Sequence, residues 1–239
     1  MNSGLARQLR TRTRQVRGAA RSRRDKRDVD TRQQLLEAAL QLFAARGFHA
    51  VTVREISRRA GANLAAISYH FGDKLGLYAE ILERTIAAMR ALHETSVAAA
   101  AHLPAEDKLR EFVRTYLPRA ARPDERGALM QQLMRHEMHT PTRLLERVFE
   151  RGIAPRMRYL QAIIAELLAC SPDEERVQLC ALSIQGQCLF FMRDKLRANL
   201  PKLWSPRSDA DLARATEHVA EFAVAGVRAF AKAPRSARE

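Results

Sequence analysis

Cysteine, proline, glycine and aromatic residues are all scarce in this chain of 239 residues, and each shortage excludes a class of protein. The three cysteines, Cys170, Cys180 and Cys188, show no CxxC spacing, so they indicate neither a disulfide framework nor a zinc site, and they suit the reducing cytoplasm. Aromatic residues make up 6% of the chain, and Val and Ile are too sparse for many strands. These shortages favour an all-α fold.

Long hydrophobic runs are also missing. The longest apolar stretch, 177–192, is interrupted by Gln178, Gln185 and Gln187 and is shorter than the roughly 20 residues that span a bilayer. The N-terminal residues lack the apolar segment of a secretory signal. We therefore predict no membrane helix and a cytoplasmic location.

Catalytic and cofactor-binding motifs are absent as well. The sequence contains no phosphate-cradling Gly-rich loop, no nucleophile elbow and no HExxH. His136 and His139 share one helical face, but the sequence names no third ligand, and zinc takes three or four. The sequence thus predicts no enzyme, no cofactor and no metal. The alternative is a helical metalloprotein that uses these two histidines.

Acidic residues are almost missing from the N-terminus. Residues 1–27 hold ten Lys or Arg and a single acid, Asp25, and the net charge of the whole chain is +14. Too few apolar residues lie between these charges to offset the entropy of ordering, so we expect a disordered basic arm over 1–28. The arm is interpreted either as a nucleic-acid-binding segment or as a solvated tail. A short tail is expected at 234–239.

Signals for three short helices follow the arm. In the first, apolar residues recur at helical spacing over 31–47, with Thr31 and Gln34 as a capping box and Gly47 as the stop. A second capping box pairs Thr52 with Glu55 at the start of the next helix. Each helix thus carries a marked N-terminus.

The second and third helices meet across a turn. Gly61 ends the second helix, and Asn63 is a good N-cap for the third. Two short helices joined by a turn of about three residues that contains Gly are typical of a helix-turn-helix.

The third helix has the residues of a DNA-reading helix. Ala65 and Ala66 are small enough for the backbone to approach the major groove, and their methyl groups can touch that of thymine. Hydroxyl, imidazole and cationic groups nearby suit phosphates and base edges, and the N-terminus of the second helix suits a phosphate. The predicted DNA-binding residues are Thr52, Arg54, Asn63, Ala65, Ala66, Ser68, Tyr69, His70 and Lys74.

Residues 31–78 closely resemble the DNA-binding domain of TetR-type bacterial transcriptional regulators. The resemblance runs without gaps and includes Gly47-Phe48, Thr52-Val53, Ala60-Gly61 and Tyr69-His70-Phe71. It implies a helix-turn-helix domain over 29–75 that binds double-stranded operator DNA as part of a homodimer. It also implies phosphate contacts by Thr52, Tyr69, His70 and Lys74, and positions over base edges for Asn63, Ala65, Ala66 and Ser68.

The remaining chain has the periodicity of further helices. A long helix from Asp73 precedes apolar-periodic segments at 105–121, 127–139, 141–169, 173–199 and 208–232, and Pro155 should kink or split the third of these. The stretches HEMHTPT, IAPRMRYLQAIIAELL and LSIQGQCLFF resemble the C-terminal domain of the CecR-like subgroup. This resemblance implies a helical effector-binding and dimerisation domain over 76–233.

Some side chains in that domain are candidates for an effector pocket. Met lines adaptable cavities, although a Met on a helix face more often fills a core. Gln185 and Gln187 lie in an otherwise apolar helix, so they must face a pocket, an interface or each other. Gly186 permits a close helix approach, which makes 174–198 and 208–231 candidates to pair across a twofold axis. The predicted pocket residues are Met130, Met134, Met157, Gln185, Phe191 and Met192.

The sequence therefore predicts a ligand-responsive transcriptional regulator. We expect a repressor that leaves a near-palindromic operator when a small-molecule effector, whose identity the sequence does not indicate, shifts the population of its conformations. The alternative is a nucleoid-type protein whose basic arm binds DNA without sequence preference.

Overall fold

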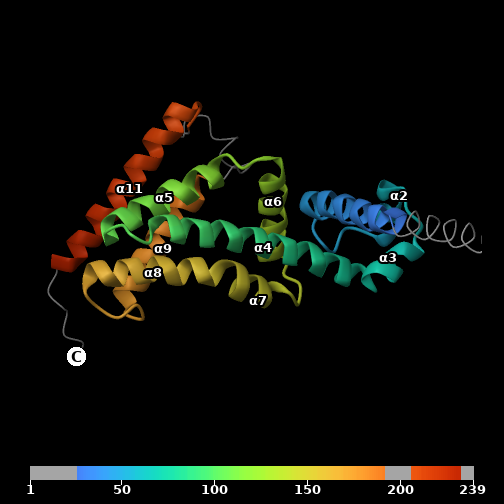
Figure 1. Cartoon of the computed structure of the whole chain (residues 1–239), viewed down its shortest axis with the longest axis horizontal. Helices are drawn as coiled ribbons and strands as arrows, with labels where there is room; N and C mark the ends of the chain where they lie inside the picture. Colours follow the sequence, from blue (N-terminus) through green and yellow to red (C-terminus); the bar gives the residue numbers. More distant parts are fainter. Residues whose placement is uncertain (1–25, 192–205, 233–239) are drawn as a thin grey trace, which may run out of the picture. The chain divides into compact units, whose positions relative to one another are not determined.

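The computed structural model describes residues 26–191 and 206–232, and these residues form helices, turns and loops without any strand (Figure 1). They separate into two compact units. The first unit contains the residues up to 82 together with 132–142, and the second contains 83–131 and the residues from 143 onward. The domain boundary that the sequence predicts at 75–76 stays a prediction, and residues 132–142 pack with the N-terminal unit.

The first unit is built on one longer helix, two short ones and the beginning of α4. A helix over 26–46 is followed by α2 (Val53–Ala60), α3 (Ala65–Phe71) and α4 (Lys74–Ala100). Its core is formed by apolar side chains that recur at helical spacing, as the sequence predicts. Fully or nearly fully buried members of this core are Leu35, Ala39, Phe43, Ile56, Ile67, Leu77 and Tyr78.

The start of the first helix corrects one prediction. The helix already includes residue 26, and the Thr31 hydroxyl donates to the carbonyl of Arg27 (2.8 Å), so Thr31 lies inside the helix and is not its N-cap. A hydroxyl that bonds to the carbonyl four residues earlier is compatible with a helix interior. Residues 26–28 of the predicted arm are thus helical, and its remainder, 1–25, lies outside the described residues.

The signals at Gly47, Thr52, Gly61 and Asp73 are confirmed, whereas residues 192–199 of the predicted segment 173–199 lie outside the described residues. Thr52 and Glu55 form a reciprocal capping box, with Glu55 N–H donating to Thr52 Oγ1 and Thr52 N–H to Glu55 Oε2. Gly47 and Gly61 end their helices with φ of 77° and 63°, a conformation that glycine adopts without strain. Asp73 caps α4, because its Oδ1 accepts from the Gly76 N–H (2.7 Å).

The second unit is a bundle of longer helices. Its main members are α5 (Ala105–Ala121), α8 (Ala154–Leu168), α9 (Glu175–Phe190) and α11 (Asp209–Lys232). They share one apolar core, and Leu92 of α4 packs against it. Buried residues of this core include Leu109, Val113, Leu117, Leu160, Ile164, Val177, Ala181, Ala220 and Val224.

The segment predicted at 141–169 is divided, as its proline indicates. It contains the short helix α7 (Leu145–Val148), one π-helical turn (Phe149–Ile153) and then α8. Pro155 lies in the first turn of α8, where its missing N–H is not needed. Gly152 is buried in the π turn, and a Cβ there would lie 3.5 Å from Ile86 and Met89 of α4.

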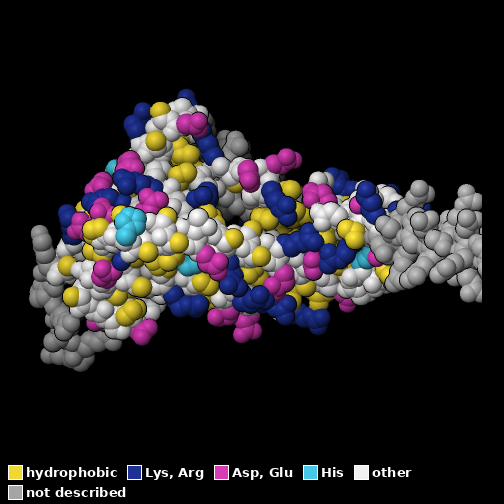
Figure 2. All heavy atoms as spheres, in the orientation of Figure 1, with side chains coloured by type: hydrophobic (Ala, Val, Ile, Leu, Met, Phe, Trp, Pro, Cys, Tyr) yellow, Lys and Arg dark blue, Asp and Glu magenta, His cyan; other side chains and the backbone are white. Residues whose placement is uncertain are grey.

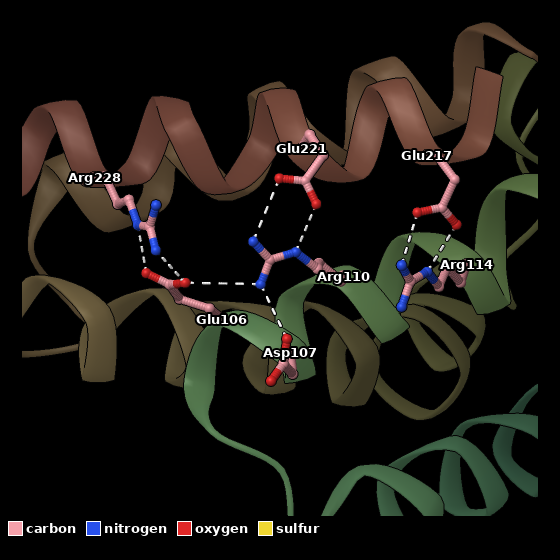
Figure 3. A network of polar contacts seen from close by, with 7 residues as sticks. All are labelled: Glu106, Asp107, Arg110, Arg114, Glu217, Glu221 and Arg228. Carbon is pink, nitrogen blue, oxygen red and sulfur yellow. Dashed lines mark hydrogen bonds and ion pairs between the residues drawn. The ribbon is translucent and has the colours of Figure 1, made fainter. Parts of the chain in front are cut away.

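Ion pairs run along the contact between α5 and α11 (Figure 3). Arg110 Nε donates to Glu221 (2.7 Å), Arg114 Nη2 donates to Glu217 (2.7 Å), and Arg228 pairs with Glu106. These partners lower the pKa of both α11 carboxyl groups. Figure 2 shows the resulting mixture of basic and acidic side chains where α11 lies.

Two helices have residues in both units. Residues 74–82 of α4 and 132–139 of α6 (Glu125–His139) belong to the first unit, and the rest of each helix belongs to the second. Within the described ranges, no helix has both the length and the apolar character needed to cross a membrane.

Candidate nucleic-acid interface and ligand region

The turn between α2 and α3 fixes how α3 is presented. The Ala62 N–H donates to the Ser57 carbonyl (3.0 Å), and Asn63 Oδ1 accepts from the Ala65 N–H (2.9 Å). The N-cap position of α3 is Leu64 and not Asn63 as predicted, but the Asn63 side-chain oxygen still accepts a hydrogen bond from the first residue of the helix. Ile67 anchors the helix with 2% of its surface exposed.

The opposite face of α3 is open to solvent. Ala65 and Ser68 are exposed, Ala66 is half-buried, and 76% of Tyr69 is accessible. This face carries two alanines, a serine and a projecting tyrosine, whereas an exposed helix face usually carries charged side chains. It can approach another polar surface closely and offers hydroxyl groups to phosphates or base edges.

The exposed side of α2 adds positive charge. Arg54 and Arg58 lie one turn apart, both are exposed, and neither side chain has a hydrogen bond or ion pair within the described ranges. Arg59, in contrast, donates to Gln41. Thr52 is exposed, and its hydroxyl donates to Glu55 Oε2 (2.8 Å) within the capping box. Arg54 and Arg58 are thus the free cations next to α3.

His70 and Lys74 are tied to their own unit. The His70 side chain is 7% exposed, and its Nε2 lies 3.6 Å from Asp28 Oδ1. Lys74 Nζ donates to the carbonyls of Phe48 (3.0 Å) and Val51 (2.9 Å). Their predicted phosphate contacts stay predictions, and their observed contacts link α3 and α4 to the rest of the unit.

A buried carboxyl group joins α6 to α4 within the first unit. Tyr78 donates its hydroxyl to Glu137 Oε2 (2.7 Å), and Thr142 donates its N–H and hydroxyl to Oε1 (3.0 and 2.8 Å). Glu137 is 1% exposed. The sequence analysis missed this residue, although Glu137 follows buried Leu133 by one turn and so falls on the apolar face of its helix.

The two histidines of α6 have neighbours inside the protein. A Cβ at Gly47 would lie 3.1 Å from His136 Nδ1, and His139 Nδ1 lies 2.9 Å from the Arg135 carbonyl oxygen. Among the described residues, no group of three potential metal ligands is found.

The predicted pocket residues are divided between the two units, and their role in a pocket stays a prediction. Met134 belongs to the first unit, whereas Met130, Met157, Gln185 and Phe191 belong to the second. Met157 and Phe191 pack against the core of the second unit. Gln185 is 8% exposed, and its Oε1 has no hydrogen-bond partner among the described residues. Met192 lies outside the described residues.

The structure adds a residue that the sequence analysis did not name. Arg156 lies on α8 with a solvent-shielded Nε that lacks a hydrogen-bond partner within the described ranges. The signal was present in the sequence, because Arg156 precedes Leu160, Ile163 and Ile164 by four, seven and eight residues. This spacing places a charge on the apolar face of the helix.

Comparisons with known proteins identify both parts of the chain. The family model of bacterial regulatory proteins of the tetR family matches residues 35–81. The model described as the C-terminal domain of the HTH-type transcriptional dual regulator CecR matches residues 105–227. CecR of Shigella flexneri is 30% identical over 184 residues, which cover 73% of this chain and 81% of that protein.

Other relatives share less of the chain. The transcriptional activator FasR of Mycolicibacterium smegmatis is 42% identical over 69 residues, which are 29% of this chain and 31% of FasR. The solved structure of HlyIIR, a hemolysin II transcriptional regulator, has a TM-score of 0.54 at 20% identity and covers 80% of this chain and 97% of that chain. AibR, in complex with isovaleryl coenzyme A and operator DNA, has a TM-score of 0.56 at 15% identity with the same coverage.

The solved structures share the fold, and the family models and CecR establish the relationship. Transcriptional regulators of this kind fit the helix-turn-helix interpretation and not the nucleoid-type alternative. The chain belongs to the TetR family of bacterial transcriptional regulators, and its C-terminal domain is of the CecR type.

Proposed function

We propose that this protein acts as a homodimeric cytoplasmic repressor that binds a near-palindromic DNA operator through α3 and leaves it when a small molecule binds the second unit. One observation carries the proposal: α3 is anchored by buried Ile67 and turns the exposed residues Ala65, Ser68 and Tyr69 away from the core. Small side chains on a rigidly held helix are what major-groove entry requires.

The neighbouring charges give the helix its affinity. Arg54 and Arg58 have no partner within the described ranges, so their guanidinium groups are free to neutralise phosphates beside the groove. The exposed N-terminus of α2 at Thr52 adds a second favourable position for a phosphate. Phosphate contacts of this kind position the reading helix, and the base edges under Ala65 and Ser68 supply the sequence preference.

An exposed apolar surface supports the dimer. On α9, Leu179, Leu182 and Leu189 are 56%, 61% and 45% exposed, and a Cβ at Gly186 would meet no atom within 4 Å. On α11, Phe222 and Phe230 are more than half exposed. A second copy that covers these stripes would bury them, and a twofold pair would place its reading helices about 34–36 Å apart.

Release by a ligand requires a connection between the two units. The helices α4 and α6 each contribute residues to both units, so a ligand that prefers one arrangement of these helices would shift the population of DNA-competent dimers. A protein of the same fold, AibR, has been solved with both operator DNA and isovaleryl coenzyme A. That structure supports ligand control as a property that this fold can carry.

The test begins with the operator. Genome-wide footprinting with the purified chain should yield near-palindromic sites, and Ala65→Glu should lower operator affinity by about 100-fold or more because it places a carboxylate against DNA. Ala65 is exposed, so the melting temperature should not change. Arg158→Ala, at an exposed position on α8, is the matched control and should bind normally.

The salt dependence of DNA binding tests which residues contact phosphates. Arg54→Ala and Arg58→Ala should each weaken binding to all sequences and reduce the salt slope by about one. Lys74→Ala should do the same only if its ammonium reaches a phosphate. Deletion of residues 1–27 should keep the operator preference, and a truncated chain that loses nearly all DNA binding would favour the nucleoid-type protein instead.

A further inference from the structure

Arg156 is the one charged side chain of α8 that interrupts the buried face of that helix. It lies one turn before Leu160, which is 0% exposed, and two turns before Ile163 and Ile164. Its Nε is shielded from solvent and has no hydrogen-bond partner among the described residues. A guanidinium nitrogen that loses water without gaining a hydrogen bond is destabilising, so its presence needs an explanation.

Aromatic and polar side chains from three other helices lie around this guanidinium. The Arg156 Cζ lies 5.0 Å from the centroid of the Tyr116 ring on α5. The Tyr116 hydroxyl lies 3.2 Å from His93 Nδ1 on α4, and the His93 ring packs edge-on against Tyr159 at 5.6 Å. On α9, Cys188 is buried near enough for Arg156 to affect its thiol.

These neighbours do not supply a negative charge. Burial raises the pKa of the Tyr116 and Tyr159 hydroxyls and raises the pKa of the Cys188 thiol to about 11, so all three are neutral at pH 7. Burial also lowers the pKa of His93, which leaves the imidazole neutral. Arg156 keeps its charge although burial lowers its pKa, because a guanidinium is not deprotonated in proteins.

Nearby carboxylates have other partners. The charge of Glu111 helps to raise the pKa of the Tyr159 hydroxyl, and Glu111 accepts a hydrogen bond from Thr115 (3.3 Å). Glu94 forms an ion pair with Arg90 (3.1 Å). Neither forms an ion pair with Arg156 within the described ranges. Within the described residues the guanidinium therefore lies over the Tyr116 ring but pairs with no carboxylate.

Two further polar atoms lack partners in the same bundle. The Tyr159 hydroxyl, one turn after Arg156, and Gln185 Oε1, one turn before Cys188, are both shielded from solvent without a hydrogen bond among the described residues. Unsatisfied buried polar atoms are few in native proteins, and each needs a reason. The apolar side chains Leu92, Met157 and Phe191 are partly buried and pack against the same core.

We infer that the second unit binds a small organic acid, with its carboxylate paired to Arg156 and its apolar body against Leu92, Met157 and Phe191. The inference rests on the proposed function, since it names the chemical class of that effector. Tyr159 and Gln185 then provide a hydroxyl and an amide for a second polar group of the ligand. A planar guanidinium can donate two parallel hydrogen bonds to the two oxygens of a carboxylate, which favours an acid over a neutral ligand.

The test compares acids with their neutral isosteres. The full chain is melted with benzoate or octanoate at increasing concentration, and with benzamide or octanamide as matched neutral probes. A ligand that binds only the native state raises the melting temperature with concentration. We expect stabilisation by an acid that its amide does not produce, and equal effects of acid and amide, or none from either acid, would overturn the inference.

Variants assign the effect to Arg156. Arg156→Met should weaken acid binding by about thirtyfold or more. Its ligand-free melting temperature should stay equal or rise, because a buried charge without a partner is removed. Arg158→Met, at the exposed position two residues along α8, should behave like the wild type in both measurements. Arg156→Lys keeps the charge without the fork and provides a second variant if the first folds poorly.

One rival explanation is tested directly. An internal ion pair of Arg156 would make Arg156→Met lower the ligand-free melting temperature. That result would overturn the inference. The melting measurements need no DNA, so they test acid binding separately from the proposed function. A protein that binds the acid through Arg156 but stays on its operator would contradict release by the ligand and leave the acid site supported. If a neutral compound released the operator from both the wild type and Arg156→Met, the acid inference would be wrong and the proposed function would stand.

Discussion

At the level of single residues, polar side chains beside the reading helix divide into those that are free and those that already have partners. Arg54 and Tyr69 are exposed, whereas Lys74 donates to two carbonyl groups and His70 faces Asp28. The positions of these four residues in the sequence do not show which side chains are free and which are bonded. Burial and hydrogen bonding distinguish them, because a group that is satisfied within the protein gains less from a phosphate.

Glu55 provides a test of the capping box. Hydrogen bonds from Arg46 and Thr52 lower the pKa of its carboxyl group to about 2, from an ordinary value near 4.5. A carboxyl group whose pKa is lower in the folded state stabilises the protein above the unfolded pKa, and the contribution is lost as the pH falls toward 2. We expect Glu55→Gln to be less stable at pH 7 and to lose part of the acid dependence below pH about 4.5.

Urea denaturation from pH 7 to pH 3 measures this effect. Glu37→Gln, at an exposed position of the first helix, is the control and should keep the acid dependence of the wild type. If Glu55→Gln and the wild type lose stability in parallel over this range, the capping box does not hold the carboxyl group in its charged form.

At the level of elements, the end of α6 is held in the first unit by Glu137. Its carboxyl group accepts from Tyr78 on α4 and from Thr142 just beyond α6, and all of these contacts are shielded from solvent or partly so. Burial and the bond to Glu137 raise the pKa of Tyr78, so its hydroxyl remains a donor across the physiological range. The pair therefore links two helices that contribute to both units.

We expect Glu137→Ala to lower the free energy of unfolding of the first unit by about 1–3 kcal/mol, because it leaves the Tyr78 hydroxyl buried without an acceptor. Tyr78→Phe removes the donor, and the double variant should cost less than the sum of the two single changes. A double-mutant cycle in urea, followed by hydrogen exchange of the first helix, measures the coupling. Strictly additive effects would show that the hydrogen bond does not couple α4 to α6.

At the level of the whole molecule, the exposed apolar stripe on α9 predicts self-association. Leu182→Glu places a charge in the middle of this stripe, where it would have to be buried on dimerisation. We expect the variant to sediment as a monomer at concentrations where the wild type is a dimer, and to bind an operator more weakly because half-sites are then bound singly.

Folding of the monomer should not suffer, since Leu182 is 61% exposed within one chain. Arg158→Glu introduces the same carboxylate at an exposed position of α8 and should leave the dimer intact. A Leu182→Glu variant that sediments like the wild type would place the dimer contact elsewhere.

Local signals predicted most of the helical architecture. The capping box at Thr52, the stops at Gly47 and Gly61, and the range 105–121 all agree with the structure, because each depends on residues within one or two turns. The N-cap prediction for Thr31 is wrong because a threonine hydroxyl can either cap a helix or donate to a carbonyl within it. The neighbouring sequence does not distinguish these two roles.

The sequence by itself determined the helix-turn-helix and the small exposed face of α3, because short-range periodicity and capping encode them, and its motifs over 31–78 carried the resemblance to the family. Tertiary structure alone decided that Glu137 is buried against Tyr78, that residues 132–142 join the first unit and that Arg156 lies among Tyr116, His93 and Tyr159. These facts depend on contacts between residues 20 to 70 positions apart, roughly, where packing and not local preference sets which polar group loses water.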